Sequence, residues 1–223
     1  MNQEIKDLIH ISHFYGADKE YVIAGGGNTS FKDDNIIVVK ASGQPLADLN
    51  ENGLVTLSRE KLREISRKKY PDDPVKREDQ VKKDLFNSII DPAGGRRPSV
   101  ETSLHEMIRY RYVVHLHPTL INGVLCSRNA VSITKKLFGN EVLFVPYTDP
   151  GYTLFKKLED EITIYRKSHT SDPQIIFLEN HGVFVGADTI EEIRKIYTHL
   201  TDTIGSIIPR LTNIEPLPYN PVM

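Results

Sequence analysis

Residues 110–123 read YRYVVHLHPTLING, a short apolar stretch that carries two histidines. Its valines, and the proline that closes it, predict a β-strand over 112–118. Side chains at positions i and i+2 of a strand point to the same side, so His115 and His117 are expected to present both imidazoles to one site. A zinc ion takes two of its ligands in this way, whereas an isolated His-x-His is more often a pair of structural, hydrogen-bonded histidines.

A third histidine and a carboxylate strengthen the case for a metal. His181 lies in LENHGVF, at a glycine turn that we expect between two apolar strands over 174–188. Three neutral histidines with an open fourth position make a catalytic zinc set, although His181 alone would be a turn residue. Glu101 is expected near the start of a helix that leads into the histidine strand. There it either stabilises the helix N-terminus or acts as an acid/base beside the metal. From spacing alone, the metal site and the structural interpretation are equally favoured.

The composition is ordinary for a globular protein. The chain has 223 residues, of which 39% are hydrophobic and 26% charged, and its formal net charge is −2. This balance gives no electrostatic case for binding nucleic acid or an anionic membrane. No apolar run approaches the roughly 18 residues that indicate a transmembrane helix. The single cysteine, Cys126, excludes an internal disulfide, fits a cytoplasmic location and leaves His, Asp and Glu as metal ligands.

Periodicity and turn residues predict alternating helices and short strands in a single α/β domain over 1–223. The polar segment 58–86 is expected to be a solvated surface, with a first helix that ends before Tyr70 and Pro71. The proline-rich tail over 209–223 is expected to be extended. Further expected elements are a helix over 3–15, a hairpin turning at 33–35, a helix over 99–111 capped by Ser99, helices over 119–128 and 152–165, a strand over 141–147, and a helix over 189–208 capped by Thr189.

Six motifs occur in an order that resembles the class II aldolase and adducin family. They are GGGNTS (25–30), KASG (40–43), RPSVETSLH (97–105), VVHLHP (113–118), VPYTDPG (145–151) and ENHGVF (179–184). The first three and VPYTDPG look most like the aldolase domain of the rhamnulose-1-phosphate aldolase/lactaldehyde dehydrogenase-type proteins. The resemblance implies a three-layer α/β/α fold with a central, mainly antiparallel or mixed sheet. It also implies a homotetramer, and it makes segment 61–83 a peripheral insertion relative to the shorter aldolases.

The resemblance assigns roles residue by residue. His115, His117 and His181 match the family's ligands of a divalent metal, usually Zn²⁺. Glu101 matches its catalytic acid/base. Val100 stands where the fuculose enzyme has a serine, which removes one hydroxyl from the phosphate site. The expected phosphate-binding positions are Asn28, Thr29, Ser42, Gly43 and Ser99.

These matches imply a metal-dependent aldolase that cleaves a ketose 1-phosphate into dihydroxyacetone phosphate and a small aldehyde. Glu101 would move the proton, and the metal would act as a Lewis acid. Epimerases, dehydratases and decarboxylases of the same fold share a similar metal triad and stay open as alternatives. Adducin-like interaction modules lack the metal ligands, so the three histidines argue against that role. A zinc metallohydrolase outside the family is opposed only by the phosphate-loop motifs.

His105 is set apart from the expected metal ligands. It lies four residues after Glu101, on the same face of the expected helix. It either orients Glu101 or touches the site. We expect a structural role in support of the ligands rather than metal binding.

Overall fold

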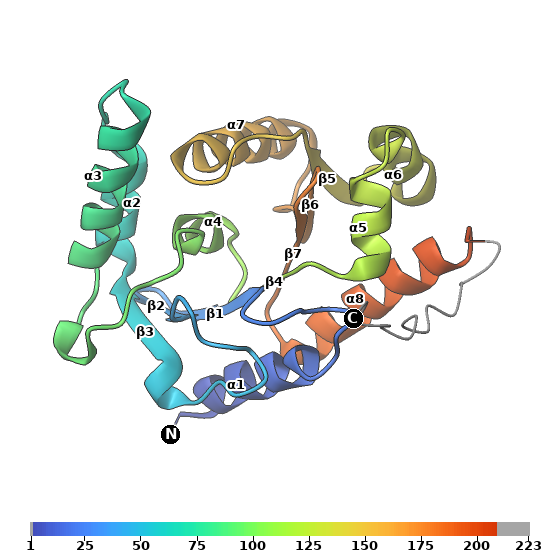
Figure 1. Cartoon of the computed structure of the whole chain (residues 1–223). Coiled ribbons are helices and arrows are strands. Elements are labelled where there is room, and N and C mark those ends of the chain that lie inside the picture. Colours follow the sequence, from blue (N-terminus) through green and yellow to red (C-terminus); the bar gives the residue numbers. More distant parts are fainter. Residues whose placement is uncertain (1, 209–223) are drawn as a thin grey trace, which may run out of the picture.

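A seven-stranded sheet runs through the middle of the molecule, in the order β3-β2-β1-β4-β7-β6-β5 (Figure 1). The structure is a computed structural model that describes residues 2–208. All neighbouring strands pair antiparallel except β5 and β6, which pair in parallel. The predicted mainly antiparallel or mixed sheet is therefore confirmed. The strands are β1 (Asn28–Lys32), β2 (Ile36–Lys40), β3 (Leu54–Ser58), β4 (Tyr112–Leu116), β5 (Val142–Val145), β6 (Ile175–Leu178) and β7 (Gly182–Ala187).

Helices cover both faces of the sheet, which gives the predicted three-layer α/β/α architecture (Figure 1). Helices α1, α5, α6 and α8 pack on one face, and α4 and α7 pack on the other. Helices α2 and α3 cover the β2–β3 end on the α4 side. The helices are α1 (Gln3–Gly16), α2 (Arg59–Arg67), α3 (Pro74–Asn87), α4 (Thr102–Met107), α5 (Thr119–Leu125), α6 (Ala130–Phe138), α7 (Tyr152–Ser168) and α8 (Ile190–Gly205), with 3-10 turns at Glu51–Gly53 and Pro92–Gly94.

The alternation of strand side chains decides what faces each layer. In β4, Val114 belongs to the core under α1 and α8, and Val113 to the core under α4 and α7. His115 therefore faces the α4 layer, like Val113. Asn28 of β1 pairs with His115 on one side, and Phe184 of β7 pairs with it on the other. A row of three side chains thus crosses the sheet beneath α4.

Helix α4 is shorter than the helix predicted over 99–111, and its N-cap is Glu101 rather than Ser99. The Ser99 hydroxyl accepts the Glu101 N–H at 3.2 Å, and the Ser99 carbonyl accepts the Thr102 N–H at 3.1 Å. Ser99 is thereby used in a turn that precedes the helix. At the other end Ile108 is extended, because the chain must enter β4. The predicted position of Glu101 at the start of the helix is confirmed.

Other local predictions are confirmed by hydrogen bonds. Thr189 caps α8 by accepting the Glu192 N–H at 3.2 Å. The hairpin turn at 33–35 is held by the Asp33 carboxylate, which accepts the N–H groups of Asn35 and Ile36 at 2.8 Å each. Helix α2 ends at Arg67, ahead of the Tyr70–Pro71 pair.

Two helices were not predicted. Helix α3 forms the second half of the polar segment 58–86, and α6 follows α5. Helices α2 and α3 bury a narrow apolar stripe that includes Leu62 and Leu85, so the segment is solvated on one side only. The predicted tail over 209–223 lies outside the described residues. Within 2–208, no helix is both long and apolar enough to cross a membrane.

Candidate metal centre

Three histidines meet on the α4 side of the sheet. His115 lies in β4, His117 follows that strand directly, and His181 lies in the turn between β6 and β7. One ring nitrogen from each histidine lies within 4.8 Å of the other two, and the Nε2 atoms of His115 and His117 are 3.0 Å apart. Tetrahedral zinc, with bonds of about 2.0–2.1 Å, separates two nitrogen ligands by roughly 3.3 Å. The donor set therefore fits a divalent metal with imidazole ligands.

The surroundings of His115 prepare its Nε2 as a ligand atom. The fully buried ring stacks on Phe184, with centroids 4.0 Å apart. Its Nδ1 lies 3.1 Å from the Val183 carbonyl oxygen. A carbonyl only accepts hydrogen bonds, so Nδ1 carries the proton and the Nε2 lone pair faces the other two histidines. Burial lowers the pKa of His115 to about 3, which keeps the ring neutral near pH 7.

The turn that carries His181 differs from the expected glycine turn in one respect. The residue with left-handed backbone is Asn180, with φ of +56°, rather than Gly182. Asparagine tolerates this region better than most residues with a Cβ. The Asn122 side chain also donates to the His181 carbonyl at 3.1 Å, which ties the turn to α5. These contacts aim the His181 ring at the other two histidines.

Glu101 faces the three rings from the start of α4. Its Oε1 lies 3.3 Å from His181 Nε2 and 3.5 Å from His115 Nε2, and Asn28 Nδ2 donates to its Oε2 at 2.5 Å. Burial raises the pKa of Glu101. Electrostatic attraction to the His115 imidazolium, which forms only at acid pH, and hydrogen bonds from His181 and Asn28 outweigh burial and hold the pKa well below its usual value. Glu101 is thus a carboxylate with one oxygen at the triad and the other held by the protein.

Asn28 and Thr29 are neighbours that point to opposite faces of the sheet. Asn28 faces Glu101. Thr29 is fully buried on the α1 side, where its hydroxyl lies 2.8 Å from the hydroxyl of Ser12. The structure therefore does not bring the Thr29 side chain to the other predicted site residues. Both residues were expected to bind phosphate, but Asn28–Lys32 is β1, and strand alternation separates the two side chains.

Two of the predicted phosphate loops lie side by side next to Glu101. Ala41 and Pro98 form a β-bridge, and the Ser42 N–H donates to the Arg97 carbonyl at 2.8 Å. Ser42 and Gly43 are exposed, and Gly43 has φ of +80°, a conformation that favours glycine. Ser99 continues the second loop and is half-buried beside Glu101.

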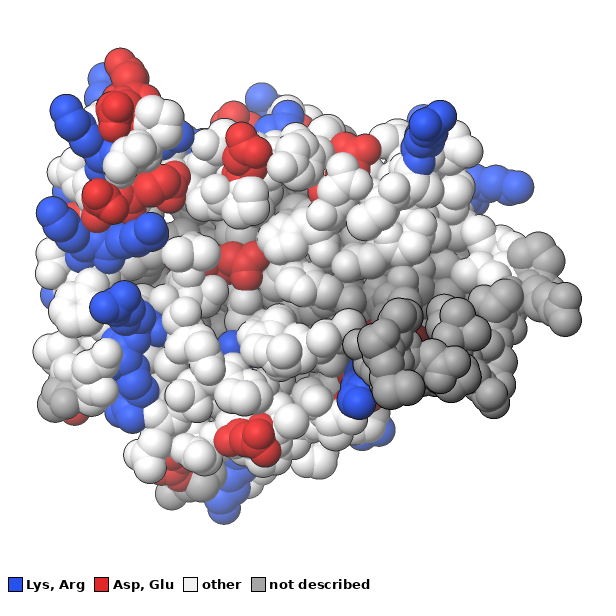
Figure 2. All heavy atoms as spheres, viewed as in Figure 1, with Lys and Arg blue, Asp and Glu red and all other residues white. Residues whose placement is uncertain are grey.

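A cavity of about 580 Å³ lies between these loops and α3. Lys82, Lys83 and Arg97 line it, and no acidic side chain does. Across residues 2–208, the side chains of these three cations have no ion-pair or hydrogen-bond partner. Val100 and Ser42 complete its wall on the loop side. Figure 2 shows Lys and Arg side chains gathered at and below the lower end of α3. The field in the cavity therefore favours an anion.

Buried polar residues support Asn28: His105, for which a structural role was expected, together with Ser30 and Lys32, which the sequence did not single out. His105 Nδ1 lies 2.7 Å from the Ser30 hydroxyl, its Nε2 contacts Asn28 Oδ1, and Lys32 Nζ donates to the His105 carbonyl. Burial lowers the pKa of Lys32 to about 7. The available signal was the polar series at 28, 30 and 32, which alternation places on one face of β1.

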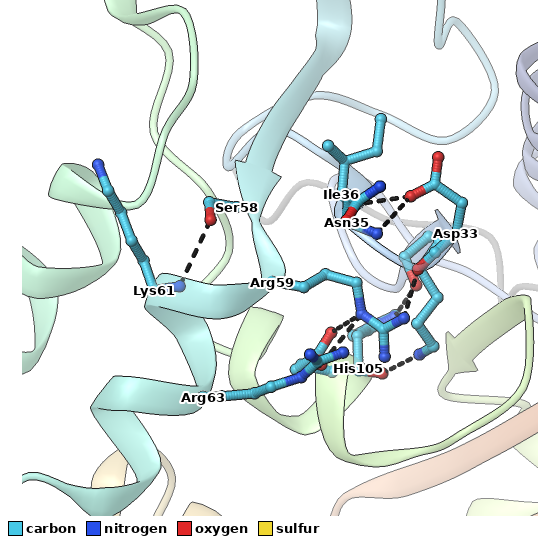
Figure 3. A network of polar contacts seen from close by, with 11 residues as sticks. Asp33, Asn35, Ile36, Ser58, Arg59, Lys61, Arg63 and His105 are labelled. Carbon is cyan, nitrogen blue, oxygen red and sulfur yellow. Dashed lines mark hydrogen bonds and ion pairs between the residues drawn. The ribbon is translucent and has the colours of Figure 1, made fainter.

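Helix α2 contacts α4 through two arginines, Arg59 and Arg63, which Figure 3 shows beside the segment that carries His105. Arg59 Nε donates to both carboxylate oxygens of the buried Glu106, at 3.1 and 2.8 Å, and Arg63 Nε lies 3.3 Å from one of them. Arg59 also donates to the Asp33 carbonyl. The start of the polar segment thus fixes the helix that carries Glu101 and His105.

Comparison of the sequence with known proteins agrees with this geometry. The profile described as "Class II Aldolase and Adducin N-terminal domain" matches residues 6–204. The chain is 29% identical over 197 residues to "Uncharacterized oxidoreductase YuxG" of Bacillus subtilis, which covers 84% of this chain and 27% of that protein. This chain therefore spans about a quarter of the length of that relative. It is 25% identical over 190 residues to L-fuculose phosphate aldolase of Methanocaldococcus jannaschii, covering 80% of this chain and 82% of that protein.

Solved structures share the fold. The N-terminal class II aldolase domain of a conserved protein from Thermoplasma acidophilum aligns with a TM-score of 0.77 and 25% identity, covering 93% of this chain and 95% of that one. L-fuculose-1-phosphate aldolase from Thermus thermophilus aligns with a TM-score of 0.59 and 15% identity, covering 92% of this chain and 93% of that one. At 15% identity the second likeness shows the fold alone.

Proposed function

This chain belongs to the class II aldolase and adducin family, and we propose that it is a metal-dependent aldolase that cleaves a ketose 1-phosphate. The products are dihydroxyacetone phosphate and a small aldehyde. We propose Zn²⁺ as the metal and a homotetramer as the assembly. The observation that carries the proposal is the position of Glu101, whose Oε1 lies 3.3 and 3.5 Å from nitrogens of the histidine triad.

The reaction needs a proton carrier and a sink for negative charge. The bond between C3 and C4 of the ketose breaks, the C4 hydroxyl loses its proton to give the aldehyde, and C3 gains a proton. These changes balance without a further reactant. A divalent metal held by His115, His117 and His181 supplies Lewis-acid stabilisation of charge on the carbonyl side. Glu101 Oε1 faces the same space and carries the proton that C3 receives.

The anionic end of the substrate is assigned to the cavity between α3 and the two loops. Ser42, a predicted phosphate position, lines this cavity, and Gly43 and Ser99 belong to the same two loops. Lys82, Lys83 and Arg97 add three positive charges. Val100 lines the same cavity and precedes Glu101, so this wall and the acid/base are contiguous in the chain. Val100 has no hydroxyl to bind the phosphate, and the ammonium groups of Lys82 and Lys83 in α3 take over that role. A volume of about 580 Å³ is within the usual size of small-ligand pockets.

The proposal is tested with purified protein before and after metal supplementation. We expect about one divalent metal per chain, lost in His117→Ala, and cleavage of a panel of ketose 1-phosphates measured as dihydroxyacetone phosphate released. The matched control is His199→Ala, a half-exposed histidine outside the centre. A chain that binds no metal after supplementation, or that binds metal and cleaves no member of the panel, contradicts the proposal.

A further inference from the structure

A continuous series of hydrogen bonds runs under α4 and ends at Glu101. It passes from the Ser30 hydroxyl to the His105 ring at 2.7 Å, from that ring to Asn28 Oδ1, and from Asn28 Nδ2 to Glu101 Oε2 at 2.5 Å. Ser30 and His105 are at most 1% exposed, and Asn28 is 6% exposed. Water therefore does not compete with these contacts, and every donor needs its acceptor inside the protein.

The chemistry of the partners fixes the direction of each bond. A carboxylate only accepts, so the amide nitrogen of Asn28 faces Glu101 and its oxygen faces His105. That oxygen only accepts, so His105 Nε2 carries a proton. A neutral ring then leaves Nδ1 as the acceptor of the Ser30 hydroxyl. The opposite orientation of Asn28 would set its carbonyl oxygen against the carboxylate of Glu101.

We propose that His105 is a positioning residue that holds the Asn28 amide in the orientation that donates to Glu101. The hydrogen bond from Asn28 fixes the position of Glu101 Oε2, so that the other oxygen, Oε1, faces the histidine triad. The consequence for catalysis rests on the proposed role of Glu101 as proton carrier, whereas the orientation of the amide does not. Buried partners of this kind commonly change activity by roughly 10- to 100-fold when they are removed.

The backbone around His105 is held firmly enough for such a role. Lys32 Nζ donates to its carbonyl, and the ring packs edge-on against Phe184 with centroids 5.3 Å apart. The next residue, Glu106, forms ion pairs with Arg59 and Arg63 of α2. Figure 3 labels both arginines beside His105. The His105 backbone is therefore held by Lys32 and by the ion pairs of its neighbour Glu106, and the ring is held by Phe184 of β7. Its Nε2 stays directed at Asn28.

The first test is the tautomer of His105, read by ¹⁵N nuclear magnetic resonance on the wild-type protein near neutral pH. We expect a neutral ring protonated at Nε2. A ring protonated only at Nδ1 overturns the proposal, because Nε2 would then have no proton to donate to Asn28. The measurement uses no substrate and no variant, so it stands whether or not the chain proves to be an aldolase.

The second test separates positioning from folding. His105→Leu removes both ring nitrogens, and His105→Gln keeps one donor and one acceptor at a similar spacing. We expect kcat to fall roughly 10- to 100-fold in His105→Leu, with KM and metal content unchanged, and to recover most of the loss in His105→Gln. Wild-type kcat in a folded His105→Leu protein overturns the proposal. Absence of cleavage by the wild type contradicts the proposed function, and the tautomer alone then decides the role of His105.

Discussion

Gly182 lies directly against the ring of His117. A Cβ at position 182 would be 2.5 Å from His117 Cδ2, 2.6 Å from the Leu116 carbonyl oxygen and 3.2 Å from His115 Cε1. Two of these atoms belong to the proposed metal ligands and one belongs to the backbone of β4. Gly182 is therefore required by space rather than by backbone conformation, because β7 pairs with β4 where the histidines leave the sheet.

Gly182→Ala is expected to displace His117 and to weaken metal binding. The His117 ring must shift to clear the methyl group, and the contact with the Leu116 carbonyl oxygen is relieved only if the β4–β7 backbone also moves. Overpacking of this kind typically costs about 1–3 kcal/mol of stability. Metal content by elemental mass spectrometry and thermal unfolding check both effects.

Gly123→Ala is the matched control. Position 123 is exposed in α5, and a Cβ there meets nothing within 4 Å. Alanine is a better helix former than glycine, so stability should rise by about 0.5–1 kcal/mol with metal content unchanged. Full metal occupancy in Gly182→Ala would contradict the packing argument.

Glu101→Gln is expected to keep the metal and lose turnover. The amide has nearly the same shape, and the three imidazoles are untouched, but the side chain no longer takes up a proton. Loss of a general acid/base typically costs about 10²–10⁴-fold in rate. Steady-state kinetics beside metal analysis checks the split. Glu141→Gln, at a half-exposed carboxylate near His199, controls for the change of one charge. Wild-type turnover in Glu101→Gln would remove Glu101 from the proposed mechanism.

Replacing Lys82 and Lys83 together by glutamine is expected to raise KM for a ketose 1-phosphate by roughly 10-fold or more, with little change in kcat. Each lysine faces a cavity without acidic residues, so each removed charge weakens attraction to a phosphate, by about 1 kcal/mol at about 4 Å in a water-like medium and more where water is excluded. Initial-rate kinetics at low and high salt measures the effect, which should shrink as salt rises.

The control for that pair is the Lys135→Gln, Lys136→Gln double variant in α6. It removes the same net charge from a helix on the opposite face of the sheet. Its KM should match that of the wild type. Equal KM values for the two double variants would show that α3 does not hold the anionic end of the substrate.

Lys32 is expected to make stability rise with pH above neutrality. Burial lowers the pKa of Lys32 from 10.5 to about 7 in the folded protein. Between those values the unfolded chain binds a proton that the folded chain does not, so raising the pH favours the folded state. Below about pH 7 both states are protonated, and this lysine adds no pH dependence. The slope is at most about 1.4 kcal/mol per pH unit for one proton.

Urea unfolding of the wild type and of Lys32→Met between about pH 6 and 9.5 measures this term. Groups that do not interact with Lys32 titrate equally in both proteins, so the difference between the two unfolding free energies reports mainly on Lys32. That difference should be level below about pH 7 and should move in favour of the wild type above it. A difference that stays constant across the whole range would mean that Lys32 keeps its ordinary pKa.

Much of the architecture follows from local patterns in the sequence. The apolar run around His115 predicted a strand, Thr189 predicted a helix start, and the Asp33 turn predicted a hairpin, because each depends on neighbours a few residues away. Helices α3 and α6 escaped prediction. The apolar stripe of α3 is narrow within a highly charged segment, so the helical spacing of its few apolar residues could not be recognised in the sequence.

The sequence by itself placed His115 and His117 on one face of a strand and Glu101 at a helix start, and its motifs resembled one family. Those conclusions rest on the two-residue period of a strand and on short motifs. Only the tertiary structure decided that Thr29 turns away, that Gly182 makes room for His117, and that His105 reaches Asn28. The reason is physical: pairing of β1 and β7 with β4, and the packing of α2 on α4, join residues far apart in the chain, and local patterns do not encode those contacts.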